Sequence, residues 1–157
     1  MKQTKPDMTS AASQLKSLID EYLPLLNKIA AEDFTYKPSA DKWSRKEIIG
    51  HLIDSAQNNI RRFIVAQYED TPEIVYDQDK WVSMNNYQQQ PSHDVIQLWY
   101  LINKQVAAIM DNLPPEASQR KSMSEELHTI EWLGHDYIRH MRHHMHVVLG
   151  RESVVYP

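Results

Sequence analysis

The residues with the clearest capacity for chemistry in this chain are histidines. Four of the eight lie within one short segment, YIRHMRHHMHVVLG, residues 137–150. A neutral imidazole binds divalent metal ions, and histidine also titrates close to neutral pH. Because the sequence contains no cysteine, a metal site here has to use nitrogen and oxygen ligands. The segment is therefore a metal site, a pH-sensitive surface, or the polar face of a helix with no chemical role.

The spacing of these histidines divides them into two groups. His140 and His144 are four residues apart, which in a helix places them about 40° apart around the axis and about 6 Å apart along it. Both imidazoles can then reach one point from the face expected to turn inward. His135, His143 and His146 are expected to face mainly solvent. A single pair at this spacing is weak support for a metal site, because such pairs also arise by chance.

A third histidine lies on the margin of another apolar helical stripe. His51 follows Ile48 by three residues and precedes Leu52 by one, so its side chain can also turn inward. Three imidazoles from two neighbouring helices would bind a metal ion on one side and leave other positions open, as catalytic sites do. Zinc and nickel suit imidazole ligands best here. We therefore predict a divalent metal site formed by His51, His140 and His144.

Two aspartates lie one helical turn from these histidines. Asp54 follows His51, and Asp136 precedes His140. A carboxylate that accepts the second ring N–H of a metal-bound histidine fixes its tautomer and orientation. Solvation at the surface is the alternative for both aspartates, and the sequence leaves the choice open.

The composition indicates how these residues are positioned. The chain has 157 residues and only three glycines, too few for the turns of an all-β fold. We predict one all-α domain over residues 1–157. The net charge of -4 comes from interspersed charges, which argues against nucleic acid as a partner. No apolar run is long enough to cross a membrane and no signal peptide is evident, so we expect a cytoplasmic protein.

Apolar periodicity predicts four amphipathic helices. They run from Leu15 to about Ile29, from about 45 to 67, from Ser92 to about Ile109, and from Thr129 to Gly150. Ser44 and Glu47 have the spacing of a capping box at the start of the second, while Ser92 and Thr129 are the expected N-caps of the third and fourth. Four helices of similar length indicate a four-helix bundle with a long crossover between helices two and three.

That crossover, residues 70–90, has no regular period and is rich in polar and aromatic side chains. Long ordered loops in a compact domain are often functional, so we expect it to form the rim or lid of a pocket above the metal; packing against the bundle is the alternative. The expected rim residues are Tyr76, Asp77, Trp81, Asn85, Asn86 and Tyr87.

Glycines and tryptophans add two further expectations. Gly50 and Gly134 lie inside predicted helices, where glycine costs about 1 kcal/mol relative to alanine. Either close helix packing or space for a ligand would explain them. The tryptophans are expected to anchor the core; they are Trp43, Trp81, Trp99 and Trp132.

Three stretches together resemble the DinB-like superfamily of metal-binding four-helix bundles. They are KPSADKWSRKEIIGHLIDSAQNNIRRF, then YDQDKW, and finally TIEWLGHDYIRHMRHHMHVVLG. The likeness extends from about Leu15 to Gly150. The most specific parts are the Trp-Ser-x-x-Glu helix start with GHLIDS and the late DYIRHMRHH pattern, in that order.

The resemblance implies a divalent metal, zinc or nickel, bound by His51, His140 and His144, and it implies a homodimer formed through helix faces. Related proteins include thiol S-transferases that use a low-molecular-weight thiol, a maleylpyruvate isomerase group and proposed hydrolases. The expected function is thus a metal-dependent enzyme with a small-molecule substrate. The resemblance favours a thiol S-transferase-like activity, and metal-dependent hydrolysis is the other chemistry that it implies. The further residues by which thiol-dependent relatives are recognised are not located in this chain. The alternative is a non-catalytic metal-binding bundle for stress response or interaction.

Overall fold

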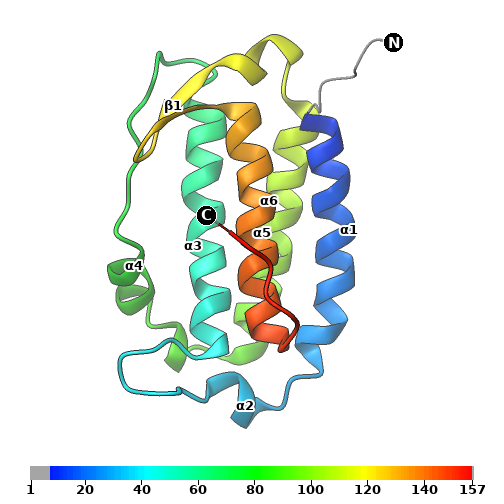
Figure 1. Cartoon of the computed structure of the whole chain (residues 1–157), viewed down its shortest axis with the longest axis vertical. Coiled ribbons are helices and arrows are strands. Elements are labelled where there is room, and N and C mark those ends of the chain that lie inside the picture. Colours follow the sequence, from blue (N-terminus) through cyan, green and yellow to red (C-terminus); the bar gives the residue numbers. More distant parts are fainter. Residues whose placement is uncertain (1–7, 157) are drawn as a thin grey trace.

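The computed structural model, which describes residues 8–156, is a bundle of four long helices standing side by side (Figure 1). The helices are α1 (Met8–Asn27), α3 (Arg45–Val65), α5 (Ser92–Asn112) and α6 (Ile130–Leu149). The predicted helical bundle is confirmed. No helix within residues 8–156 is long and apolar enough to span a membrane.

Shorter elements fill the connections. They are α2 (Ala31–Thr35), α4 (Gln78–Asn85), η1 (Tyr87–Gln89), η2 (Pro115–Gln119), β1 (Lys121–Met123) and β2 (Leu127–Thr129). The crossover predicted to be irregular therefore contains a helix: the Asp77 side chain accepts a hydrogen bond from the backbone N–H of Lys80, and Asn86 ends the helix in the left-handed conformation. The polar connector before α6 forms an antiparallel hairpin of β1 and β2, which the sequence analysis missed because each strand has only three residues.

The long crossover makes α3 and α5 run in the same direction. In Figure 1 the chain leaves the top of α3, descends along its outer side through α4, and enters α5 at the bottom. The descending segment is tied to the hairpin by a parallel bridge between Glu73 and Met123. Crossover and hairpin thus form a wall beside α3 and α6, the two helices that carry the predicted metal ligands.

The helix ends test the predicted caps. Ser44 and Glu47 form a complete capping box at the start of α3, and Thr129 caps α6 by accepting from the N–H of Trp132. The Ser92 prediction is wrong, because the N-cap of α5 is Pro91 and Ser92 is the first helical residue. Helix α1 begins seven residues before the predicted Leu15.

We expect Ser44→Ala to lower the free energy of unfolding by about 1 kcal/mol, because it removes the acceptor for an otherwise unpaired helix N–H. The matched change Ser92→Ala should have little effect, since the Ser92 side chain makes no capping bond. Urea denaturation of both variants measures the difference. Equal destabilisation would contradict this account of the two helix starts.

The core lies between the four long helices and is centred on large side chains such as Trp99, Tyr22 and Phe63. Its buried polar residues include Asn103, whose side-chain oxygen accepts a hydrogen bond from the Tyr137 hydroxyl. The prediction that all four tryptophans anchor the core is wrong. Only Trp99 is a core residue, whereas Trp132 is 40% exposed, and Trp43 and Trp81 are half-buried at the periphery.

Candidate metal centre

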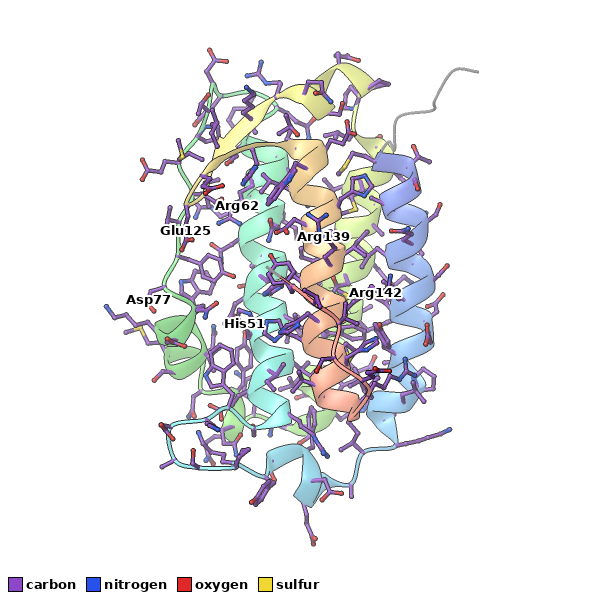
Figure 2. All side chains as sticks on the ribbon, in the orientation of Figure 1. His51, Arg62, Asp77, Glu125, Arg139 and Arg142 are labelled. Carbon is purple, nitrogen blue, oxygen red and sulfur yellow. The ribbon has the colours of Figure 1, made fainter. Side chains whose placement is uncertain are left out.

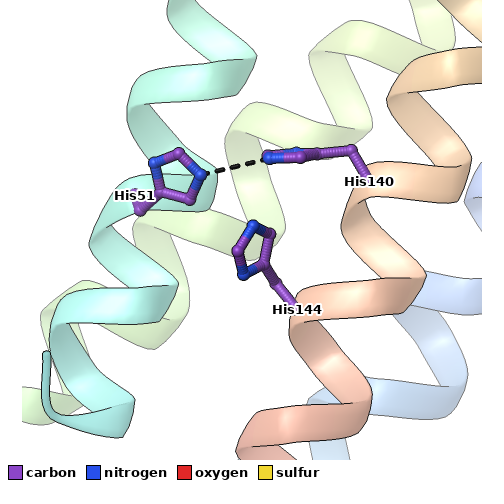
Figure 3. A group of neighbouring side chains, drawn as sticks. All are labelled: His51, His140 and His144. Carbon is purple, nitrogen blue, oxygen red and sulfur yellow. Dashed lines mark hydrogen bonds between the residues drawn. The ribbon is translucent and has the colours of Figure 1, made fainter. Parts of the chain in front are cut away.

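The three predicted histidines converge between two helices (Figure 3). His51 lies in the second turn of α3, while His140 and His144 occupy successive turns of α6. The Nε2 atoms of His51 and His140 are 3.1 Å apart. One ring nitrogen from each residue lies within 4.8 Å of the other two. Helix spacing and bundle packing therefore bring the three side chains to a common point.

Burial keeps these imidazoles neutral. His51 is 1% exposed, and burial, followed by the nearby His144, lowers its pKa to about 3. Burial and then His143 lower the pKa of His144 to about 4. The pKa of His140 is also well below its ordinary value, chiefly through burial. At neutral pH each ring can therefore offer a lone pair without first losing a proton.

The arrangement fits a divalent metal ion. Two nitrogen ligands of a tetrahedral zinc ion lie about 3.4 Å apart, given bond lengths of about 2.1 Å, and the His51 and His140 nitrogens are already 3.1 Å apart. Within residues 8–156 the ligand group contains three histidines and no fourth histidine or carboxylate. A bound ion would thus keep at least one position open for another molecule.

The two aspartates do not hydrogen-bond the histidines. Asp54 is fully buried, so the surface-solvation alternative is wrong for it; it accepts from the Tyr87 hydroxyl at 2.6 Å and from Asn85 at 3.1 Å. Burial raises the pKa of Asp54 to about 6, opposed in part by the Tyr87 hydrogen bond. Asp136 accepts instead from the Tyr156 hydroxyl at 2.8 Å. The Nδ1 atom of His51 is buried and has no hydrogen-bond partner among the described residues.

The C-terminal segment, residues 151–156, turns back across α6 (red in Figure 1). His143 and His146 each donate from Nδ1 to a backbone carbonyl of this segment, at Val154 and Glu152, both at 2.8 Å. The ring of Tyr156 then packs 5.4 Å from that of His140. His143 and His146 were expected mainly to face solvent, but they hold this segment against the metal centre.

We expect Tyr156→Ala to expose His140. In metal-free protein, diethyl pyrocarbonate should modify His140 several-fold faster in this variant than in the wild type, because the ring that covers the imidazole has been removed. Peptide mass spectrometry reports the modification residue by residue. Val155→Ala is the matched control, since Val155 is 89% exposed. Equal rates in both variants would mean that the segment does not cover the site.

A cavity of about 530 Å³ borders the centre on the His140 side. Helices α3 and α6 contribute half of its lining, namely Ser55, Asn59, Arg62, Trp132, Leu133, Asp136, Tyr137 and His140. The crossover contributes Val75, Tyr76 and Gln78, and the hairpin region contributes Ser124, Glu125, Glu126 and His128. Tyr156 of the C-terminal segment completes the lining. The cavity thus lies between the α3–α6 face and the wall formed by crossover and hairpin.

The rim prediction holds in part. Tyr76 lines the cavity. Trp81 does not line it but packs against Tyr76, with ring centroids 5.7 Å apart. Asn85 and Tyr87 pack inward onto Asp54 instead, so the packing alternative is correct for them. Asp77 caps α4.

Helix α3 contributes a polar lining to the cavity that was not predicted from the sequence. Ser55, Asn59 and Arg62 follow His51 at intervals of four, eight and eleven residues, so all four share one helical face. All four are buried. These polar residues could have been predicted to line a site, because they continue with helical spacing from His51, a predicted metal ligand.

Comparison with known proteins gives two matches. Residues 14–148 match the sequence profile of the DinB superfamily. Among solved structures, YfiT from Bacillus subtilis, described as a probable metal-dependent hydrolase with an unusual four-helix bundle topology, superposes with a TM-score of 0.80. The alignment covers 96% of this chain and 89% of that chain, at 19% sequence identity, and establishes a shared fold. Comparison with curated proteins found no significant match.

Proposed function

The chain belongs to the DinB superfamily, and we propose that it is a divalent-metal-dependent enzyme that hydrolyses a small-molecule substrate. The observation that carries the proposal is the convergence of three neutral imidazoles beside a polar cavity, with no fourth protein ligand in residues 8–156. A structural metal site is normally closed by four protein ligands, whereas a catalytic site keeps a position open. The shared fold with YfiT, described as a probable metal-dependent hydrolase, favours hydrolysis.

In this proposal His51, His140 and His144 hold the ion. When bound, a divalent ion supplies Lewis-acid polarisation and makes a water molecule more acidic. The protein contributes positioning and enclosure. Ser55 and Asn59 present polar groups along the cavity floor, and Tyr76 and Tyr156 wall it from the crossover and the C-terminal segment. The cavity is open to solvent, which gives a small molecule access to it.

Thiol transfer is the second candidate, and the absence of cysteine favours it. A protein without its own thiol has to take the sulfur nucleophile from a small molecule, and metal ligation lowers the pKa of a thiol. A low-molecular-weight thiol would enter the same cavity beside His140. The physiological metal, zinc or nickel, and a homodimeric state remain predictions.

The test uses protein stripped of metal and reconstituted with zinc or nickel. We expect turnover of members of an ester and amide panel only after reconstitution, with loss on adding a chelator. A parallel assay follows the loss of free thiol when glutathione, cysteine or bacillithiol is offered with an alkylating electrophile. Thiol consumption without hydrolysis would select the second candidate. Strong thermal stabilisation by metal without turnover in either assay would overturn both and favour the non-catalytic alternative.

A further inference from the structure

Arg62 is a buried cation that the proposed metal chemistry does not use. It lies on α3 three turns beyond His51, on the same helical face, and it lines the cavity. Figure 2 shows His51 and Arg62 at different heights along α3. The side chain is 9% exposed. A charge buried to this extent normally has a partner of opposite charge.

The protein partners of Arg62 are all neutral. Its Nε and Nη2 atoms donate to the carbonyl of Ile74 at 3.1 and 2.8 Å, and Nη1 donates to the Asn59 side-chain oxygen at 3.4 Å. The guanidinium also lies 5.9 Å from the centre of the Tyr76 ring. It has five N–H groups, so two have no acceptor among the described residues. No carboxylate of residues 8–156 forms an ion pair with it.

The acidic residues of the cavity compensate this charge only in part. The Asp136 carboxylate raises the pKa of Arg62 by charge attraction but forms no ion pair with it, and its two oxygens accept from Arg139 and Tyr156. Glu125 and Glu126 are exposed on the turn between the two strands, where water screens them. The lining of the cavity therefore contains one buried cation, Arg62, that has no ion-pair partner among residues 8–156.

We propose that Arg62, oriented by Asn59, binds a single anionic group of the substrate, a carboxylate or a phosphate. A guanidinium suits either group because its fork of N–H donors matches two oxygens at once. Because Arg62 is a single buried cation in this lining, the class that fits is a small molecule with one anionic end. The identification of this ligand as the substrate rests on the proposed function; the anion site itself does not.

The positions of the two groups define the shape of that molecule. Eleven residues separate His51 from Arg62, a rise of about 16 Å along a helix. A substrate that contacts both the histidine centre and Arg62 is therefore extended, with its reacting group and its anionic group at opposite ends.

The test measures binding to metal-free protein, so no turnover is required. The probe is monomethyl adipate, which carries a carboxylate at one end and an ester at the other. It is compared with the neutral analogue in which a primary amide replaces the carboxylate, and with a phosphate monoester of the same length. Affinities come from NMR titration of isotope-labelled protein. We expect one or both anionic probes to bind at least about tenfold more tightly than the amide, since hydrogen bonds between charged groups are the strong ones.

Substitutions at Arg62 and Arg61 test which residue causes the preference for anionic probes over the amide. Arg62→Gln should abolish the preference for the anion, and Arg62→Lys should retain part of it. Arg61→Gln, the same charge change at an exposed neighbour on α3, should preserve it. Equal binding of the amide and both anionic probes to the wild type would overturn the proposal even if Arg62→Gln fails to fold. An unchanged preference in folded Arg62→Gln would also overturn it.

Zinc titration separates this inference from the proposed function. Zinc binding to Arg62→Gln should equal that of the wild type, because Arg62 is not a ligand. If the wild type prefers the anion but binds neither zinc nor nickel, the metal-dependent function fails and the anion site stands. If zinc binds and the preference is absent, the anion site alone fails.

Discussion

The His51→Ala variant should lose at least about 100-fold in affinity for zinc. His51 is the ligand contributed by α3, and without it the remaining pair, His140 and His144, comes from one helix. Loss of an outer partner of a ligand already costs about 10- to 100-fold in metal affinity, so loss of a ligand should cost more. Competition with a chromophoric chelator measures the affinity.

Thermal melting gives a second readout for the same variant. A metal that binds only the folded state raises the melting temperature, so zinc should raise that of the wild type and have little effect on His51→Ala. His93→Ala is the control, because His93 is exposed on α5 and does not belong to the three-histidine group. Equal zinc affinity of His51→Ala and the wild type would remove the metal centre and the function built on it.

The second large effect concerns stability. Gly50→Ala should lower the free energy of unfolding by about 2 kcal/mol, although alanine is the better helix former. A Cβ atom at Gly50 would lie within 2.6 Å of three carbons of the Tyr87 ring. That ring is buried and its hydroxyl donates to Asp54, so it cannot move aside without breaking a buried hydrogen bond.

Gly134→Ala is the matched comparison on α6. A Cβ there would approach the terminal atoms of the Met8 side chain at 2.7 Å, and a thioether chain has rotamers with which to move away. We expect near-neutral stability or a small gain in urea denaturation. A larger loss for Gly134→Ala than for Gly50→Ala would contradict this reading of the two sites.

The same contacts decide why helix-interior glycines are present. The sequence left close helix packing and ligand space as alternatives. The space above Gly50 is filled by an aromatic ring from the crossover, and that above Gly134 by a methionine from α1. Ligand space is therefore the wrong explanation at both positions.

Local features of the fold were predictable because their causes are local. The capping box of Ser44 and Glu47 and the Thr129 cap each depend on bonds within one helical turn. Prediction failed where a neighbouring residue or a distant segment determines the local structure. Ser92 is a good capping residue, but the preceding Pro91 takes the N-cap position, and the three-residue strands are stabilised by pairing with each other and with Glu73.

By itself the sequence determined four helices and the one face of α6 that carries His140 and His144, because helical periodicity fixes the angle between residues four apart. Only the tertiary structure decided which groups meet across helices. It placed Asp54 against Tyr87, brought the C-terminal segment over His140, and buried Arg62 without a carboxylate. Those contacts depend on how the long crossover and the hairpin pack against the bundle, and no spacing within one segment encodes that packing.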